Sequence, residues 1–169
     1  IMDGLVGSEM CIRDSHNTMD LTTFSLASPF NTSITPTQIH TVDLSTIGID
    51  LVDGENSSAT DVEFNGDGSE MFISVFNQEG DVLERIHQFS LGKNYDVSTA
   101  SHIGSVATPF VGRANNNGWM GGFSFSSDGM KLFATQKYTG DSVDQIYQYD
   151  LQCPYGIVKC SSDTSSSIE

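Results

Sequence analysis

The sequence has few basic residues and no long apolar run. Lys and Arg together number 7 against 22 Asp and Glu, so the formal net charge is −15. A surface with this charge repels a phosphate backbone, which excludes nucleic acid as a partner, and it gains nothing from an anionic lipid surface. No stretch approaches the roughly 18 consecutive apolar residues of a transmembrane helix, so we expect no membrane span.

The first fifteen residues, IMDGLVGSEMCIRDS, lack the basic region and the continuous apolar stretch of a secretory signal. Within them, GLVGSEMCIRDS resembles a phrase that recurs at the ends of unrelated environmental gene predictions, where it looks like translated sequencing adaptor. We therefore expect residues 1–15 to be a non-native or disordered leader outside the fold. Excluding Cys11 with this leader leaves two of the 3 cysteines, Cys153 and Cys160.

One phrase occurs twice in the remaining chain. FNGDGSEMF at 64–72 is followed 61 positions later by FSSDGMKLF at 125–133. The likeness continues beyond the phrase, since RIHQFSL at 85–91 matches QIYQYDL at 145–151. An earlier partial copy begins with LTTFSLASPFN at 21–31. Self-similarity at such a period indicates a repeat architecture.

Within each copy the apolar residues alternate. Met71 and Ile73 point one way while Phe72 and Phe76 point the other, which predicts a strand that is apolar on both faces. Asp-Gly pairs interrupt the alternation, and Gly accepts the positive φ of a hairpin turn. The fold is therefore expected to be all-β, with no helix, and its expected strands are 20–26, 38–44, 60–65, 70–76, 85–91, 101–106, 121–126, 130–137 and 145–151.

These residues carry a family resemblance. FSSDGMKLF resembles the β-propeller repeats of TolB and WD-type proteins. The fuller unit is similar to a propeller repeat of marine bacterial sequences, with Phe64-Asn65, Asp67-Gly68, Met71-Phe72, a strand over 86–89, and DVSTA at 96–100. The resemblance implies four-stranded antiparallel blades. It specifies a blade and not an activity, because propellers host many unrelated functions.

The chain departs from the pattern of complete propellers. Its repeat is longer than the roughly 40–50 residues of WD and kelch units, and about two and a quarter blades are expected where a ring needs roughly four to eight. We therefore expect an incomplete propeller, a fragment whose neighbouring blades belong to a longer chain. The expected boundaries are propeller blades over 16–157 and a polar tail over 158–169, the blades being a partial blade at 16–44, a full blade at 60–106 and a partial blade at 121–157.

The connections between the second and third strands and between successive blades should emerge on one face. This face gathers acidic residues, one arginine and the single tryptophan of the chain. Extended loops on a rigid scaffold often bind ligands, so the face is a candidate site, with Ca²⁺ as a conceivable cation. The alternative is a set of solvated acidic loops with the tryptophan packed between blades. The candidate ligand-binding residues are Asp81, Glu84, Arg113, Trp119, Asp141 and Asp144.

Cys153 and Cys160 flank the short loop CPYGIVKC. A disulfide between them is predicted, with two unpaired thiols or a zinc site as alternatives. A disulfide would imply an oxidising compartment, in agreement with an extracellular, periplasmic or cell-envelope location.

We expect the chain to be a non-catalytic binding or scaffolding module of an exported bacterial propeller. Its expected partner is another protein or a surface polysaccharide. The first strand of the full blade offers Asp61 and Glu63, but the second copy has Gly122 and Ser124 there, so no catalytic ring is evident. The alternative is a fragment of a propeller hydrolase or lactonase whose catalytic residues lie partly on missing blades. A plain stalk segment is a third reading.

Overall fold

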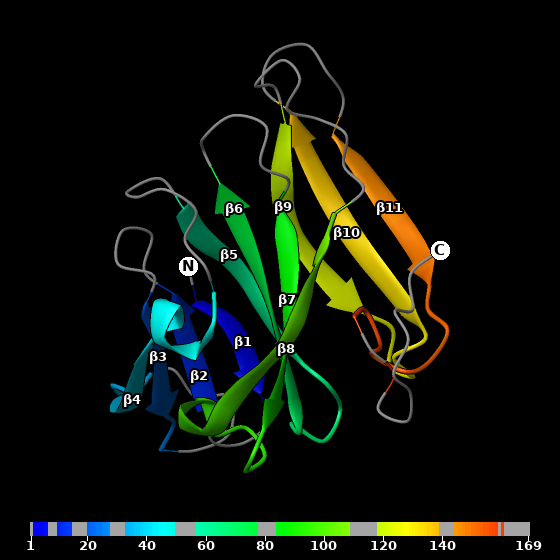
Figure 1. Ribbon diagram of the computed structural model, residues 1–169. Helices are drawn as coiled ribbons and strands as arrows, with labels where there is room; N and C mark the ends of the chain where they lie inside the picture. The colour runs from blue at the N-terminus through cyan, green and yellow to red at the C-terminus, as the bar shows by residue number, and fades with distance from the viewer. Residues whose placement is uncertain are drawn as a thin grey trace.

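The computed structural model describes residues 2–6, 10–14, 20–27, 33–49, 57–77, 84–108, 118–138, 144–158 and 160. In these ranges the chain is all-β, and its strands form three antiparallel sheets (Figure 1). The strands follow chain order within each sheet, as expected when short turns join antiparallel neighbours. Sheet A contains β1 (Met2–Val6), β2 (Met10–Asp14), β3 (Asp20–Ser25) and β4 (Thr37–Asp43).

Sheet B contains β5 (Ser57–Phe64), β6 (Glu70–Asn77), β7 (Arg85–Leu91) and β8 (Ala100–Ala107). Sheet C contains β9 (Gly118–Phe125), β10 (Lys131–Tyr138) and β11 (Gln145–Asp150). Two short 3-10 turns, η1 (Leu44–Ile47) and η2 (Val97–Thr99), are the only helical elements in the described ranges. No helix there is long and apolar enough to cross a membrane.

The N-terminal residues differ from the expectation of a disordered leader. β1 and β2 form a hairpin, and β2 pairs with β3 from Met10 opposite Ser25 to Asp14 opposite Leu21. Sheet A therefore has four strands where the sequence predicted two. The segment was left out of the expected fold because it resembles an adaptor phrase, whereas pairing with β3 gives its backbone the hydrogen bonds of a sheet. The adaptor-like origin of the segment stays a prediction.

Sheet B lies between the other two sheets and has a core on each face. Met71 and Ile73 lie in one buried cluster together with Leu21 and Leu44 of the sheet A region. Phe72 lies in a second cluster with Phe123 and Leu132 of sheet C. The prediction that β6 is apolar on both faces is thus confirmed. Stacking of sheets, face against face, is what this two-sided pattern requires.

The two copies of the repeated phrase have the same local structure. Gly68 and Gly129 have φ of 73° and 71°, a region that favours glycine. A tyrosine ring covers each glycine so closely that an added Cβ would lie 2.4 Å from the ring, Tyr95 in the first copy and Tyr155 in the second. Each tyrosine N–H donates to the carbonyl of its glycine at 2.8 Å. The repeat in sequence is therefore a repeat in structure.

Candidate functional site

The candidate site lies where the strands of each sheet end on one side of the molecule. We call this end of the strands the loop edge, and it is distinct from the outermost strand of a sheet. Cross-strand pairs identify it, with Ser57 opposite Asn77 and Arg85 opposite Ala107 in sheet B, and Gly118 opposite Tyr138 in sheet C. Figure 1 shows this edge at the top of sheets B and C, where β6 and β10 end and β9 and β11 begin. The candidate residues Asp81, Arg113 and Asp141 lie outside the described residues.

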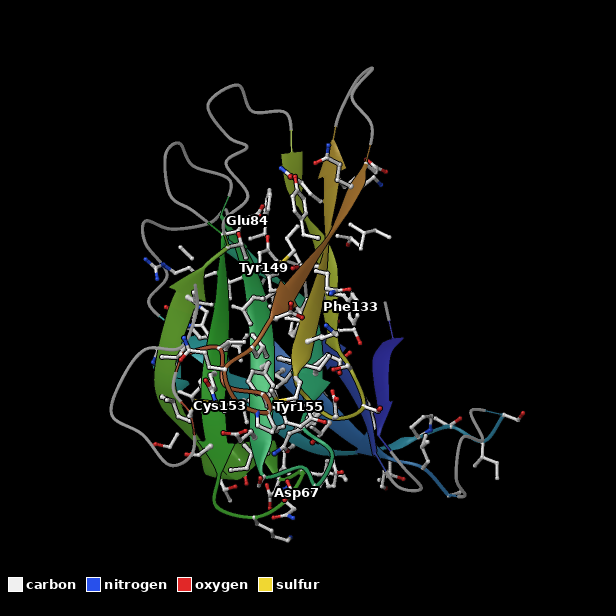
Figure 2. All side chains as sticks on the ribbon, turned by 90° about the vertical axis from the view of Figure 1, so that its right-hand side faces the viewer. Asp67, Glu84, Phe133, Tyr149, Cys153 and Tyr155 are labelled. Atoms are coloured by element: carbon white, nitrogen blue, oxygen red, sulfur yellow. A yellow bond between two sulfur atoms is a disulfide. The ribbon has the colours of Figure 1, made fainter. Side chains whose placement is uncertain are left out.

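Glu84, at the loop edge before β7, is buried and connects two sheets. Its side chain is 7% exposed, and its Oε2 accepts a hydrogen bond from the backbone N–H of Met120 in β9 at 2.5 Å. Its backbone carbonyl accepts from both the N–H and the hydroxyl of Thr108, at 2.9 and 3.1 Å. Figure 2 shows Glu84 near the upper end of the stack. Glu84, a candidate ligand-binding residue, is therefore engaged in a contact between two sheets of the protein.

The other two described candidates lie nearby on sheet C. Asp144 directly precedes β11 and is exposed. Trp119 is the second residue of β9 and pairs with Lys137 of β10, while its side chain lies outside the described residues. The structure thus places Asp144 and the backbone of Trp119 at the loop edge, with Trp119 in strand β9 and not in a connecting loop, and it places Glu84 between the sheets.

Two further carboxylates of sheet B also reach sheet C. Oδ2 of Asp61 in β5 accepts from the N–H of Phe123 in β9 at 2.8 Å. A Cβ on Gly122 would lie 3.0 Å from that oxygen, so glycine is the residue that allows this approach. Glu63 hydrogen-bonds Ser124, and burial raises the pKa of the Glu63 carboxyl above its usual value. We call Asp61, Glu63 and Glu84 the inter-sheet carboxylates.

A pair of histidines, His87 buried and His102 half-buried, lies on the face of sheet B that is turned away from sheet C. Nδ1 of His87 lies 3.1 Å from Nε2 of His102, so one neutral ring donates to the other. His87 is 6% exposed, and burial lowers its pKa to about 4, with further lowering from the charges of His102 and Arg85. Burial also lowers the pKa of His102. His87 is therefore a packed residue of strand β7.

The aspartates of the Asp-Gly turns are structural. Oδ1 of Asp67 accepts from the N–H of Ser69 at 2.9 Å, and Oδ1 of Asp128 accepts from the N–H of Met130 at 3.0 Å. Side-chain hydrogen bonds from Ser69 and Ser126, followed by these backbone hydrogen bonds, hold the pKa of the Asp67 and Asp128 carboxyl groups below the usual range. Within the described ranges, no group of three or more His, Cys, Asp and Glu side chains has a geometry suited to a metal ion. The two aspartates therefore stabilise the backbone of their own hairpin turns.

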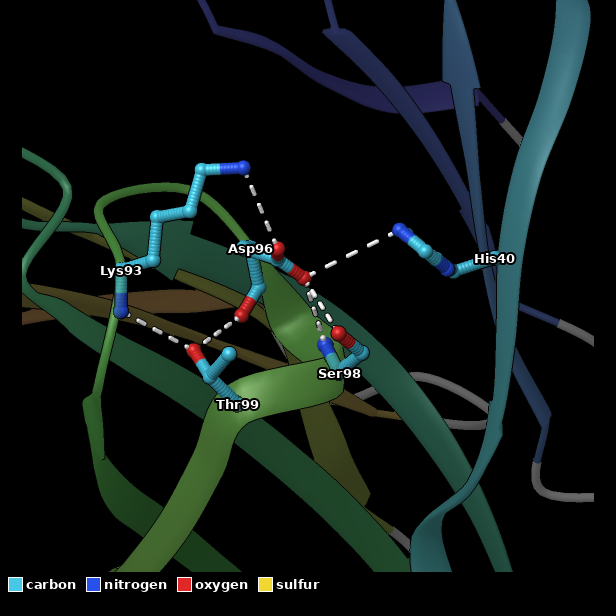
Figure 3. A network of polar contacts seen from close by, with 5 residues as sticks. All are labelled: His40, Lys93, Asp96, Ser98 and Thr99. Atoms are coloured by element: carbon cyan, nitrogen blue, oxygen red, sulfur yellow. Dashed lines mark hydrogen bonds and ion pairs between the residues drawn. The ribbon is translucent and has the colours of Figure 1, made fainter.

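Sheet A and sheet B are also joined by a polar network around Asp96 (Figure 3). Its Oδ1 accepts from the N–H and hydroxyl of Ser98, and the hydrogen bonds of Ser98 are the main cause of its lowered pKa. The same Oδ1 lies 3.9 Å from Nε2 of His40 in β4, while Oδ2 lies 3.5 Å from Nζ of Lys93. Asp96 thus caps η2 and faces the neighbouring sheet.

The loop between the two cysteines packs on sheet B. Cys153 and Cys160 form a disulfide with a Cα–Cα distance of 5.8 Å. Within the loop, the N–H of Val158 donates to Oε1 of Gln88 at 3.1 Å. Tyr155 stacks near Phe72, with ring centroids 6.3 Å apart. The disulfide therefore closes a loop whose side chains hold sheet C against sheet B, and Figure 2 shows Cys153 beside Tyr155.

The chain matches no protein-family model, and no curated protein or solved structure was found to be similar to it. The functional argument therefore depends on the geometry of the described residues.

Proposed function

We propose that the chain is a non-catalytic binding or scaffolding module of an exported bacterial β-propeller. The first strands of the three sheets support this architecture, because β1 lies beside β5 and β5 lies beside β9. The sheets pack face to face behind these strands through two buried clusters. In a propeller the blades are arranged radially in this manner around a central channel. Each sheet is then one blade.

The proposal that the module is non-catalytic rests on one observation, which is that the inter-sheet carboxylates form hydrogen bonds with the neighbouring sheet. Asp61 and Glu84 accept backbone N–H groups of β9, and Glu63 bonds Ser124 of the same strand. General acid–base catalysis needs a carboxyl within hydrogen-bond reach of the substrate proton. A carboxyl already bonded between two packed sheets does not meet this condition. These groups therefore stabilise the stack.

The loop edge is where we place the ligand. The connections that leave this edge are longer than the tight Asp-Gly turns at the opposite edge, and long loops on a rigid scaffold are common binding sites. The proposed contacts are Asp81, Arg113, Trp119, Asp141 and Asp144. A protein or a polysaccharide at the cell surface is the proposed partner, since aromatic and acidic side chains together suit sugar hydroxyl groups and basic peptides alike. The disulfide agrees with an oxidising compartment.

The single tryptophan of the chain makes this proposal testable by fluorescence. The chain would be titrated with dextran, amylose and a β-1,3-glucan, with and without Ca²⁺, while the emission of Trp119 is followed. We expect a saturable change with at least one polysaccharide and no increase in reducing ends over time. Asp144→Asn should weaken that binding by roughly tenfold, the effect of losing one charged hydrogen bond of about 1.5 kcal/mol.

Asp150→Asn is the matched control, because Asp150 is the last residue of β11 and lies at the opposite end of the strand from Asp144. This variant should bind as the unsubstituted chain does. An increase in reducing ends would instead support the hydrolase alternative. Equal weakening by both variants would move the ligand away from the loop edge. Emission that stays constant with all three glucans would remove the polysaccharide as partner.

A further inference from the structure

Sheet C has one face that no described residue covers, although the same face of the other sheets is buried. The third strands show this most clearly, since DLTTFSL, RIHQFSL and QIYQYDL align at 20–26, 85–91 and 145–151. Leu21 of sheet A and Ile86 of sheet B are both 1% exposed, whereas Ile146 of sheet C is 76% exposed. In sheets A and B the following sheet covers this position. We call this side of sheet C the open face.

The open face retains the groups that bind a following sheet elsewhere. Phe133 lies opposite Gln148 in the sheet and shares a face with Ile146, as Phe72 shares a face with Ile86 and Gln88 in sheet B. Gln88 accepts the N–H of Val158 from sheet C, and Gln148 is the equivalent acceptor. Asp144 likewise occupies the position of Glu84. Gln148 and Asp144 could therefore accept backbone N–H groups from another sheet packed on this face, as Gln88 and Glu84 accept them from the sheet C region.

We propose that the open face of sheet C binds sheet A of a second copy of this chain, and that two copies close head to tail into one ring of six sheets. The inference rests on the propeller architecture proposed above. Closed propeller rings contain roughly four to eight blades. The described ranges of the 169-residue chain contain three sheets, so two copies give six, whereas one copy gives three and three copies give nine. For an assembly of this chain alone, two copies therefore give the number of described sheets that lies within that range.

Sheet A offers the face that this contact requires. Phe89 of sheet B and Tyr149 of sheet C each pack against the sheet that precedes them in the chain. The aligned residue of sheet A is Phe24 in β3. Phe24 is half-buried and alternates with the fully buried Leu21 and Thr23, so it points away from sheet B. The exposed Thr41 pairs with Thr22 on this same side. Sheet A therefore has an aromatic side chain on its outer face, at the position that Phe89 and Tyr149 occupy in the contacts between sheets A and B and between sheets B and C.

Charges at the loop edge agree with this pairing. Lys137 belongs to the open face of sheet C, on the same side of β10 as Phe133. Asp20 and Asp43 are opposite each other at the loop edge of sheet A and lie on the side of Phe24. A head-to-tail contact brings this lysine toward two carboxylates. The two copies together carry twice the formal charge of −15, so salt should favour the dimer by screening the remaining repulsion.

Sedimentation equilibrium of the 169-residue chain tests the inference. We expect a mass of twice 18.3 kDa at micromolar concentration, with dissociation on dilution. Ile146→Glu should raise the dissociation constant at least about 100-fold, because each of the two contacts would then bury an unpaired charge. Ile146 is 76% exposed in a single copy, so the variant should keep the circular-dichroism spectrum of the unsubstituted chain, and the two unfolding midpoints should agree once both chains are diluted to monomer.

Two further variants separate this ring from other modes of association. Met130→Glu makes the same chemical change at an exposed residue in the Asp-Gly turn of sheet C, and it should leave the dimer intact. Thr41→Glu changes sheet A and should dissociate the dimer as Ile146→Glu does. If only Ile146→Glu acts, the open faces pair with each other and the ring is refuted. Equal dissociation by Met130→Glu would also refute it.

The mass itself has two outcomes that overturn the inference. A monomer at all concentrations means that no second copy covers the open face. A mass that continues to rise beyond the dimer means an open head-to-tail chain instead of a ring. Neither result affects the fluorescence of Trp119 with polysaccharides, which tests the binding proposal separately.

Discussion

Acid should destabilise the fold through the buried histidine pair. The pKa of His87 is lowered from 6.5 to about 4, chiefly by burial and then by the charges of His102 and Arg85. Because the folded pKa lies below the ordinary value, the unfolded chain binds the proton first as the pH falls. The stability that His87 contributes is therefore complete above pH 6.5 and is lost as the pH falls toward 4.

The size of this loss follows from the two pKa values. A shift from 6.5 to about 4 corresponds to about 3.4 kcal/mol when the site is fully protonated. At pH 4.5, where the folded protein is only partly protonated, linkage gives a loss of about 2.5 kcal/mol relative to neutral pH. The lowered pKa of His102 acts in the same direction. Glu63 and Glu70 act in the opposite direction, because their folded pKa values are raised and acid favours their folded forms.

Urea unfolding at pH 8 and pH 4.5, followed by circular dichroism, measures this effect. The opposing glutamates make a variant comparison necessary, so the useful quantity is the pH-dependent change in unfolding free energy for each chain. His87→Gln should reduce that change by about 2.5 kcal/mol. His40→Gln is the control, since His40 is an exposed histidine of β4. If His87→Gln keeps the full pH dependence of the unsubstituted chain, the histidine pair does not carry it and the reasoning is wrong.

Three other predictions concern the contacts between and within the sheets. Gly129→Ala should destabilise the fold by about 1–3 kcal/mol in urea unfolding, because the position has positive φ and the Tyr155 ring leaves no space for a Cβ. Cys153→Ser with Cys160→Ser should cost about 2.5 kcal/mol for a loop of this length, and an intact mass that does not change on reduction would disprove the disulfide. Asp61→Ala should cost about 1.5–3 kcal/mol and accelerate hydrogen exchange at the β9 amide that it releases, whereas unchanged exchange would show that the bond does not form in solution.

The repeated phrase predicted more of this fold than any other feature of the sequence. The Asp-Gly pairs specify tight turns by local conformation alone, and both turns occur where they were expected. β7 was predicted at its observed bounds, and its four consecutive residues from Ile86 to Phe89 are all buried because both faces of sheet B are covered. β5 and β9 begin three residues earlier than predicted. In each of these strands an irregularity in register, after Ala59 and beside Thr135, disturbs the alternation on which the prediction relied.

The inter-sheet contacts could not be predicted from residue types. Glu84 was assigned to a ligand site because it is acidic and belongs to a loop, yet its partner is the backbone N–H of Met120, a group that every residue except proline has. One signal was present for Asp61, since the aligned position in the other copy is Gly122, and the two turn out to be in contact. A carboxylate aligned with a glycine in a stacked repeat can thus mark two residues that meet across neighbouring units.

The loop after the third strand shows how two repeats stabilise the same shape by different chemistry. In sheet B this loop is held by Asp96, which caps η2, while the hydroxyl of Thr99 accepts from the N–H of Lys93 at 3.1 Å. Sheet C has Gly156 at the position of Asp96, so the cap is lost. Cys153 and Cys160 take the positions of Lys93 and Ala100, and their disulfide joins the two ends of the loop covalently.

The replacement has a consequence for packing between the sheets. A cap of the Asp96 type requires a polar residue two positions later, and in sheet B this residue is the exposed Ser98. Once a disulfide closes the loop, that position no longer needs a hydroxyl, and Val158 occupies it in sheet C. Its side chain packs closely against Gly104 of β8, where an added Cβ would lie 2.8 Å away, while its N–H bonds Gln88. The disulfide therefore releases a residue from capping the loop and makes it part of the contact between two sheets.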